Sequence, residues 1–435
     1  MKQQDKIFNL IKSEEKRQTE QLQMIPSENY VSENVKKAVG SVLMNKYSEG
    51  QPTKRYYQGN KYIDEIELEA KKRALKLFKL NADAWDVNVQ APTGSSANLA
   101  VYFALLEPGN KMLSMYLYDG GHLSHGWKLP DGKKVSMTSK IFSPVYYQVD
   151  PSTMQFDYEN VEQIAQKTKP ELIISGGTAY PRQINHKKMG KIAKKMGAYY
   201  MADIAHEAGL VAAGVNDSPF EYADIVTMTT RKTLRGPIGA LIFSKKELSE
   251  RIDKTVFPGL QGGPMNHSIA GIAVALKEAQ SAKFKKYATQ VIKNAQILSE
   301  ELMKHELNVI TGGTDKHLLL INLQNKNTDG WYAAWALEYA GIICNRNTVA
   351  YDTGSPFYPS GLRLGTPAIT TRGMKEREMR QIAHWINEVV NIAINITPTE
   401  TDKPRKVFKQ KIKDNKDLKT IENEVKQLCK NFPLP

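Results

Sequence analysis

A segment rich in glycine and hydroxyl side chains, APTGSSANLA at residues 91–100, contains the residue types that hold a phosphate. Thr93, Gly94 and Ser95 follow a short apolar run and precede a predicted helix. The first N–H groups of a helix have no partner within it, and the helix dipole favours an anion there. Serine and threonine are also typical of an ordinary helix cap, which stays an alternative.

Two charged residues, Asp203 and Lys232, stand where other apolar runs end. A carboxylate at the end of a buried strand needs a cationic partner, such as the ring nitrogen of a pyridine cofactor. A helix cap or a structural ion pair would explain Asp203 equally. Arg231 precedes Lys232, and a neighbouring cation lowers the pKa of an amine, which then attacks carbonyls more readily. A solvated lysine is the alternative.

The segment GGHLSHG at residues 120–126 follows another apolar run. His122 could stack on a planar cofactor or serve as a structural histidine. No Cys or Glu stands at ligand spacing, so we expect no metal site. A phosphate cradle, a reactive lysine, a carboxylate and an aromatic face together predict pyridoxal 5'-phosphate, attached to Lys232 as a Schiff base.

The elements that must position these residues form an alternating pattern between residues 85 and 245, which predicts a parallel sheet flanked by helices. Ligands bind beyond the carboxyl ends of such strands, so the four polar segments should converge. The predicted strands are 87–90, 112–115, 172–175, 198–203, 224–229 and 240–243. The predicted helices between them are 97–106, 158–167 and 187–196.

The chain is long enough for two domains. We expect residues 1–280 to form an N-terminal arm and a large cofactor-binding domain, and residues 281–435 a smaller α+β domain. The latter has a predicted strand near 317–323 and predicted helices at 330–340 and 375–394. Residues 397–418 are dense in charge and are interpreted as a linker or surface segment before a final helix.

The composition of the 435 residues, 41% of them hydrophobic, is that of a globular protein. The net charge of +14 indicates either attraction of anions or simply a solvated lysine-rich surface, and no nucleic-acid-binding motif accompanies it. Two cysteines exclude a disulfide scaffold. The polar start and the lack of an apolar run of about 18 residues predict a cytoplasmic protein without membrane contact.

The sequence resembles the serine hydroxymethyltransferase family over nearly its whole length. The resemblance implies a fold-type-I pyridoxal-phosphate transferase, with a mostly parallel central sheet in the large domain. It further implies a homodimer, or a tetramer of such dimers, with active sites shared between subunits. The matching segments are 24–30 (MIPSENY), 45–50 (NKYSEG), 54–57 (KRYY), 120–126, 203–215 (DIAHEAGLVAAGV), 229–237 (TTRKTLRGP), 257–264 (FPGLQGGP) and 361–370 (GLRLGTPAIT).

Carried over position by position, the resemblance implies roles for individual residues. The catalytic set is Lys232, Glu49, Asp203, His122 and Tyr57. The cofactor would contact Thr93, Gly94, Ser95, His122, Asp203, His206 and Lys232, with Tyr47 and Gly263 from the neighbouring subunit. The substrate would contact Ser27, Glu49, Tyr57 and Arg363. Folate would contact Glu49, Tyr56, Leu117, Gly121, Leu123 and Asn347.

These residues imply transfer of the serine hydroxymethyl carbon to tetrahydrofolate, giving glycine and 5,10-methylenetetrahydrofolate. A folate-independent aldolase acting on β-hydroxy amino acids would share Lys232, Asp203 and Arg363, so cleavage of allo-threonine without folate stimulation would favour it. A catalytically silent protein that binds nucleic acid or another anion through the +14 charge is a third interpretation, which predicts no bound-cofactor absorbance and a steep salt dependence of binding.

The sequence departs from the family pattern beside the cofactor lysine, where Arg231 replaces the usual His. A permanent cation there would alter the rate or recruit an anion. Other departures are Gln51, Thr53, Gln58, Ser96, Asp119 and Ile238.

Overall fold

The computed structural model describes residues 5–326, 328–355, 357–398 and 401–435. Its contacts divide the chain into a central unit, Val31–Thr289, and a terminal unit, Met1–Tyr30 with Gln290–Pro435. The terminal unit is therefore discontinuous in sequence. The sequence analysis assigns residues 1–30 to the larger domain, whereas the contacts group them with the C-terminal part.

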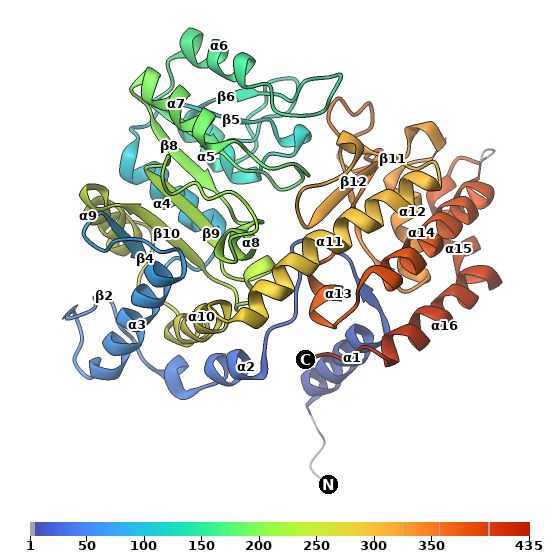
Figure 1. The fold of residues 1–435 in the computed structure, drawn as a ribbon, viewed down its shortest axis with the longest axis horizontal. Helices are drawn as coiled ribbons and strands as arrows, with labels where there is room; N and C mark the ends of the chain where they lie inside the picture. The colour runs from blue at the N-terminus through green and yellow to red at the C-terminus, as the bar shows by residue number, and fades with distance from the viewer. Residues whose placement is uncertain (1–4, 327, 356, 399–400) are drawn as a thin grey trace. The chain divides into compact units, whose positions relative to one another are not determined.

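The central unit is built on a seven-stranded sheet in the order β4-β10-β9-β8-β7-β5-β6 (Figure 1). Neighbouring strands from β6 to β9 run parallel, and β10 runs antiparallel to both β9 and β4. This confirms the expected mostly parallel sheet. The strands of the unit are β2 (Gly50–Gln51), β3 (Lys54–Arg55), β4 (Trp85–Asn88), β5 (Lys111–Met115), β6 (Ser143–Tyr147), β7 (Leu172–Ser175), β8 (Tyr199–Asp203), β9 (Ile225–Thr229) and β10 (Ala240–Lys245).

Helices cover both faces of this sheet. Strands β7 and β9 are buried at every residue, as expected for strands covered on both sides. Side chains alternate between the faces. On β8, Met201 joins the apolar cluster with α4, while the hydroxyl of Tyr200 on the other face lies 2.7 Å from Nδ1 of His186 at the start of α7. This alternation also turns Asp203 toward α4.

The helices at 97–106, 158–167 and 187–196 expected from the sequence correspond to α4, α6 and α7. β6 was not predicted. It is an edge strand, which tolerates Pro144 because one side needs no ladder hydrogen bond. The helices are α2 (Glu33–Val39), α3 (Lys61–Leu77), α4 (Gly94–Leu105), α5 (Met137–Ile141), α6 (Tyr158–Thr168), α7 (His186–Met196), α8 (Ala208–Ala212), α9 (Lys246–Lys254), α10 (Asn266–Ala279) and α11 (Ala282–Lys304), which continues into the terminal unit.

The terminal unit contains a four-stranded antiparallel sheet in the order β11-β12-β15-β14 and a parallel pair, β1 with β13. Its apolar core joins these strands to α12, α14, α15 and α16. The elements are β1 (Leu22–Gln23), β11 (Asn308–Val309), β12 (Leu318–Asn322), β13 (Ile342–Ile343), β14 (Asn345–Asn347), β15 (Gly361–Gly365), α1 (Lys6–Glu20), α12 (Gly330–Tyr339), α13 (Pro367–Thr371), α14 (Glu376–Ile396), α15 (Pro404–Lys413) and α16 (Lys416–Lys430).

The sequence analysis interprets the segment 397–418 as a linker or surface segment, and the linker interpretation is wrong for residues 404–413, which form a helix with two buried side chains. Residues 401–418 are described, and α15 occupies most of them. Phe408 and Ile412, four residues apart, are buried on one face of α15, and the Phe408 ring centroid lies 4.8 Å from that of Tyr332. A helix with many charges thus anchors itself through two apolar side chains.

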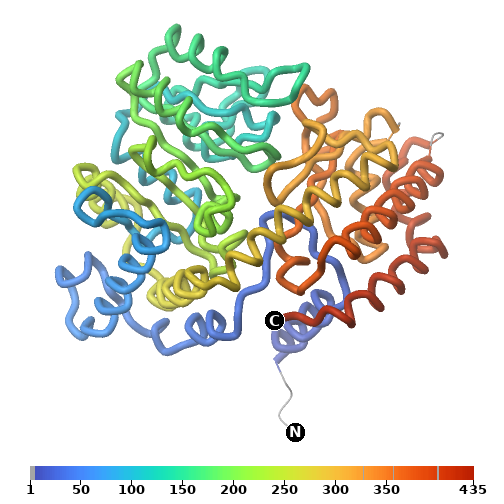
Figure 2. Tube along the Cα trace, viewed as in Figure 1, coloured from blue at the N-terminus to red at the C-terminus, as the bar shows by residue number. Residues whose placement is uncertain are grey.

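The first and last described helices, α1 and α16, lie together in the terminal unit. Figure 2 shows α1 in blue beside α16 in red, and the two helices are in contact. The buried guanidinium of Arg372 donates hydrogen bonds to backbone carbonyls from both ends, those of Gln18, Thr19 and Gln21 near α1 and those of Cys429 and Phe432 near α16. Arg372, directly after α13, therefore connects α1 and α16 through hydrogen bonds to their backbone.

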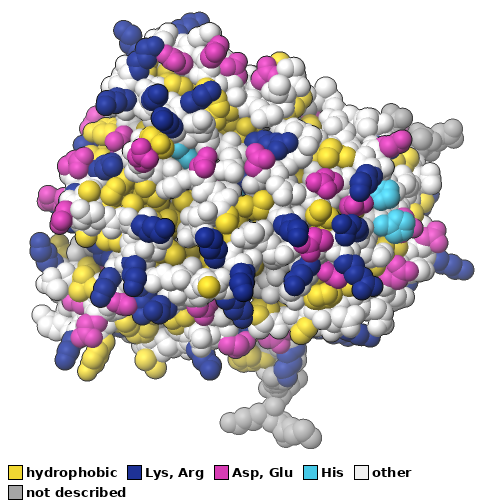
Figure 3. Space-filling view, viewed as in Figure 1, with side chains coloured by type: hydrophobic (Ala, Val, Ile, Leu, Met, Phe, Trp, Pro, Cys, Tyr) yellow, Lys and Arg dark blue, Asp and Glu magenta, His cyan; other side chains and the backbone are white. Residues whose placement is uncertain are grey.

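Basic and acidic side chains are interspersed on the face drawn in Figure 3. None of the helices in the described part of the chain combines the length and the apolar character that crossing a lipid bilayer requires.

Candidate active site

Asp203, the last residue of β8, is the centre of a buried hydrogen-bond network. Its Oδ2 accepts from Asn98 Nδ2 at 2.8 Å and lies 3.0 Å from His125 Nε2. Its Oδ1 accepts from the N–H of Ala205 at 3.0 Å. The side chain is thus fixed by a helix, a loop and its own turn, because α4 and the loop after β5 meet at the carboxyl end of β8.

The network keeps Asp203 negatively charged. Burial alone would raise the pKa of this carboxyl, but the hydrogen bond and charge of His125, the charge of His122 and the hydrogen bond from Asn98 together hold it well below its usual range. A buried anion that is held this firmly is prepared for a cationic partner.

Asn98 connects the network to two further elements. Its Nδ2 also donates to Ser124 Oγ at 2.9 Å, and its Oδ1 accepts from Thr227 Oγ1 on β9 at 2.8 Å. Ser124 Oγ in turn lies 2.7 Å from His122 Nδ1. The sequence analysis did not single out Asn98, Ser124 or His125, although all three stand inside the two segments that it selected.

Three side chains of this network, those of His122, His125 and Asp203, bring possible ligand atoms within 4.8 Å of one another. Asp203 Oδ2 and His125 Nε2 already share a hydrogen bond, and His122 Nδ1 shares one with Ser124. The geometry is explained by these bonds, and the expected lack of a metal stays a prediction.

Lys232 opens the turn η4 (Lys232–Leu234) directly after β9 and is buried, with its backbone in the left-handed region at φ +42°. Such a φ is uncommon for a residue with a side chain and requires support from its surroundings. Thr233 Oγ1 provides this support, because it donates to the carbonyl of His206 and accepts from the N–H of Gly209. A Cβ at Gly209 would lie 2.2 Å from the Thr233 carbonyl oxygen, so only glycine permits this approach.

The start of α4 is an exposed helix N-terminus next to β9. Thr93 and Ser96 form a capping box, in which Thr93 Oγ1 accepts from the Ser96 N–H at 3.3 Å and Ser96 Oγ accepts from the Thr93 N–H at 3.0 Å. The Thr93 hydroxyl is therefore used as a cap. The N–H groups of Gly94 and Ser95 have no partner within the helix and could hold a phosphate.

A second cluster of predicted site residues lies before α3 and α10. The rings of Tyr47 and Tyr57 meet edge-on with centroids 6.1 Å apart, and a Cβ at Gly263 would lie 3.1 Å from the Tyr47 ring. The charge of Glu49 raises the pKa of Tyr57. Tyr56 contacts Phe257, with centroids 5.6 Å apart. These side chains form an exposed aromatic surface that includes one carboxylate.

Three predicted site residues, Ser27, Asn347 and Arg363, belong to the terminal unit. Arg363 on β15 is 6% exposed, and its Nε donates to Asn345 Oδ1 at 3.0 Å. Burial lowers its pKa to about 10, so the guanidinium is cationic at neutral pH. Asn347 Nδ2 donates to the Thr348 carbonyl at 2.6 Å, and Ser27 is half-buried.

Three further predicted folate residues, Leu117, Gly121 and Leu123, follow β5. Leu117 begins the turn η2 (Leu117–Asp119), and Leu123 is about half exposed. Gly121 packs so closely that a Cβ would lie 2.3 Å from the Met115 carbonyl oxygen. A glycine at 121 thus allows the chain to fold back on the strand end beside His122.

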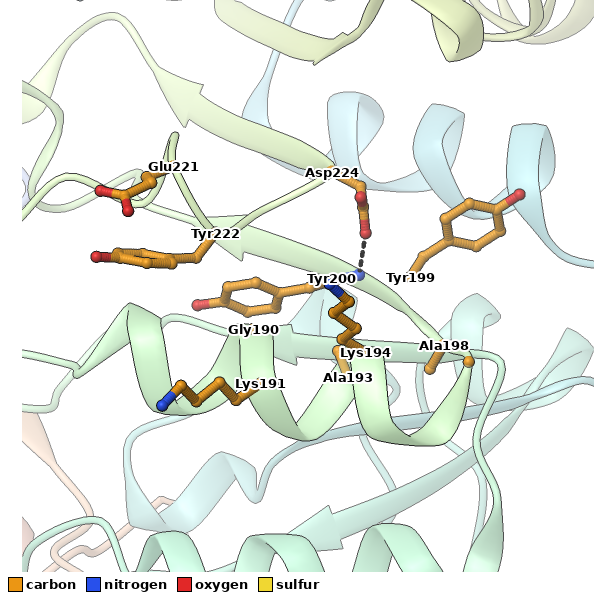
Figure 4. A pocket seen from close by; sticks show the side chains of 11 residues that line it. Gly190, Lys191, Ala193, Lys194, Ala198, Tyr199, Tyr200, Glu221, Tyr222 and Asp224 are labelled. Atoms are coloured by element: carbon orange, nitrogen blue, oxygen red, sulfur yellow. Dashed lines mark hydrogen bonds between the residues drawn. The ribbon is translucent and has the colours of Figure 1, made fainter.

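A cavity of about 590 Å³ elsewhere in the central unit lies between α7 and the segment before β9 (Figure 4). Asp224 at its edge accepts from the N–H of Tyr200 at 2.8 Å. None of the site residues predicted from the sequence lines this cavity.

Comparison with known proteins identifies the family. The serine hydroxymethyltransferase family matches residues 1–386. The chain belongs to this family. The serine hydroxymethyltransferase of Methanosarcina barkeri is 49% identical over 429 residues, which cover 98% of this chain and 97% of the relative. That of Acidothermus cellulolyticus is 47% identical over 433 residues, covering 99% and 95%. The mitochondrial serine hydroxymethyltransferase of Kluyveromyces lactis is 44% identical over 449 residues, covering 99% and 90%.

Two departures from the serine hydroxymethyltransferase pattern have a clear place in the structure. Arg231 is exposed at the edge of the lysine-bearing turn. Asp119 is buried, and its Oδ2 accepts from the N–H of Val149 at 3.0 Å. Burial raises the pKa of Asp119 to about 6. These positions change charge near the candidate site without altering the network around Asp203.

Proposed function

We propose that this chain catalyses the reversible transfer of the serine hydroxymethyl carbon to tetrahydrofolate, with pyridoxal 5'-phosphate as cofactor. The observation that carries the proposal is the buried, negatively charged Asp203, held by Asn98 and His125 at the sheet edge where the Lys232 turn begins. The names of the relatives support the same reaction. They give no support to a folate-independent aldolase.

The central unit suits this cofactor. A protonated pyridine nitrogen requires a buried anion, and Asp203 is one. A phosphate requires free N–H donors, which the start of α4 offers beside the close approach of Gly94 to Thr229. Lys232 would hold the cofactor covalently, His122 would cover its ring, and His206 would lie near its polar edge. When bound, the cofactor supplies an electron sink for the substrate Cα.

The remaining predicted residues would act on the substrate. The cationic, buried Arg363 would clamp the serine carboxylate as a bidentate pair, helped by the Ser27 hydroxyl. Glu49 would move the proton of the serine hydroxyl. Tyr57 would donate a hydrogen bond to the same hydroxyl oxygen as its charge changes. Tyr56, Leu117, Gly121, Leu123 and Asn347 would hold the folate.

A homodimer would complete each site. Tyr47, Tyr56 and Tyr57 are 65%, 69% and 45% exposed, which is unusual for aromatic residues unless a partner covers them. In the proposed dimer, Tyr47 and Gly263 of one subunit contact the cofactor of the other. We also propose a cytoplasmic location, although the relative from Kluyveromyces lactis is named as mitochondrial.

The reaction is tested by incubating the cofactor-loaded protein with serine and tetrahydrofolate and measuring glycine. We expect glycine to form with tetrahydrofolate and Lys232→Ala to abolish it, whereas Lys191→Ala on the surface of α7 leaves it unchanged. Glycine production that is insensitive to Lys232, or cleavage of allo-threonine with no folate stimulation of serine turnover, would reject the proposal.

A further inference from the structure

One cavity of the central unit, about 1050 Å³, has no role in the proposed reaction. Its walls are the end of α3, residues 211–218 at the end of α8 and in the loop that follows, and the junction between α10 and α11. No residue that we predict to contact cofactor, serine or folate lines it. Its size is that of a small-molecule site.

The charge of this cavity is positive. Four lysines line it, and no carboxylate does among the described residues: Lys76, Lys79, Lys277 and Lys285. None of the four makes an ion pair within 4.0 Å in the described part of the chain. Lys277 helps to lower the pKa of Glu69, but Glu69 pairs directly with Arg73. On the face drawn in Figure 3, Lys and Arg side chains also lie over α10 and the start of α11.

The lysines alone do not define a site. Lys76 and Lys277 stand in the last turns of α3 and α10, where the helix dipole already favours a cation. Surface lysines are also frequent in a chain with a net charge of +14. A second observation must therefore point to a ligand.

Asn216 provides that observation. It lines the cavity and is 8% exposed, and neither its amide nitrogen nor its amide oxygen has a hydrogen-bond partner. Buried amides are nearly always paired, because an unpaired one loses its bonds to water without replacement. Both amide atoms lie beneath the cavity wall, so a bound polar molecule would supply a donor and an acceptor once the side chain turns toward it.

The start of α11 adds donors to the same wall. Ser281 and Ala282 line the cavity, and Ser281 Oγ caps the helix by accepting from the Phe284 N–H at 3.2 Å. The first N–H groups of this 23-residue helix have no partner within it, and its dipole directs positive charge toward an anion.

We propose that this cavity binds a small organic phosphate with at least two negative charges, held by the four lysines and the start of α11 and read by Asn216. Lysine is a common phosphate binder, and the chain's positive charge attracts such ligands. A concave cavity suits a small molecule, whereas a nucleic-acid backbone requires an extended surface. The site is independent of the proposed reaction.

The experiment is a calorimetric titration of the cofactor-loaded protein with ATP and with inorganic pyrophosphate at 150 mM salt (about physiological ionic strength). Loading occupies the phosphate turn at α4. Lys79→Gln/Lys285→Gln should weaken binding at least about tenfold. The matched control, Lys283→Gln/Lys286→Gln, removes the same charge from α11 outside the cavity and should change binding less than about twofold. Equal weakening in both variants, or no binding of either probe, overturns the proposal.

Asn216→Leu gives a second readout that separates binding from folding. Without ligand its melting temperature should equal or exceed that of the natural protein, because an unpaired buried amide is removed. The rise in melting temperature caused by ATP should be lost. A retained ATP-induced rise contradicts the site. The proposed site would be a nucleic-acid surface instead if single-stranded RNA binds in a way that depends on Lys79 and Lys285, while ATP and pyrophosphate do not bind.

Discussion

At the scale of single residues, the charge of Asp203 depends on side chains that are distant in sequence. Asn98 comes from α4 and His125 from the loop after β5. Burial without them would raise the pKa of this carboxyl and favour its neutral form. A pyridine nitrogen would then lose its counterion, so these two partners should matter for the cofactor as much as for the fold.

We therefore expect Asn98→Ala to lower stability by about 1–3 kcal/mol, because buried groups of Asp203, Ser124 and Thr227 lose a partner. Glycine formation should also fall, with the acid limb of its pH profile moved to higher pH because the Asp203 pKa rises. Thermal unfolding and pH–rate profiles measure both effects. An unchanged acid limb of the pH profile would mean that Asn98 has only a structural role. The control is Asn391→Ala, at an exposed position on α14.

Asp119 predicts a pH dependence of stability. The pKa of Asp119 is raised to about 6 in the folded protein. Below about pH 4 this carboxyl is protonated in both the folded and the unfolded protein. As pH rises from about 4 to 6 the unfolded protein releases the proton first, so stability is lost over this range. Asp119→Asn removes this loss. Its stability relative to the natural protein should rise by about 1–3 kcal/mol between pH 4 and pH 7. Urea unfolding at both pH values tests this, with exposed Asp83→Asn as control; no pH-dependent difference would refute it.

The permanent charge of Arg231 leads us to expect that the pH dependence of catalysis differs from that of an Arg231→His variant. Arginine stays charged at all accessible pH values, whereas a histidine titrates near pH 6.5. The variant Arg231→His should therefore gain a dependence of kcat/KM between about pH 5.5 and 7.5 that the natural protein lacks. Superimposable pH profiles of kcat/KM for the two proteins would mean that the charge at position 231 does not affect the reaction.

At the scale of elements, α15 depends on few apolar contacts. Phe408 is fully buried against Tyr332. Phe408→Ala should cost about 3–5 kcal/mol of stability, because it leaves a cavity in the core of the terminal unit. Lys406→Ala on the exposed side of α15 should cost less than about 0.5 kcal/mol. Denaturation monitored by circular dichroism compares them, and equal costs would show that α15 is not anchored through this ring.

The elements also show what the sequence can reveal. Strands β7 and β9 were predictable because every residue in them is buried and apolar or small. α15 was missed because three apolar residues among many lysines carry little periodic signal, and β6 because Pro144 interrupts it. The segments around the site were found, since polar residues at strand ends stand out. The pairing of Asn98 and His125 with Asp203 was not, because it spans 105 and 78 residues.

At the scale of the whole molecule, the proposed dimer divides the catalytic groups between subunits. Glu49 lies beside Tyr47 at Gly263, so in this dimer it would act in the partner's site together with Tyr47. Glu49→Gln and Lys232→Ala proteins should each be inactive alone. After mixing and exchange of subunits, each mixed dimer would hold one intact site, which restores about 25% of the natural activity. Glycine formation and sedimentation measure this together. Sites contained within one subunit would give no recovery.

The joining of both chain ends by Arg372 has a consequence for synthesis on the ribosome. Residues 31–289 emerge as one continuous stretch and can complete their sheet while translation continues. The helix α1 must wait, because its neighbour α16 follows the whole central unit in sequence. A product released early would thus keep its sheet but hold a bare leading helix, a state that quality-control proteases can distinguish from the finished chain.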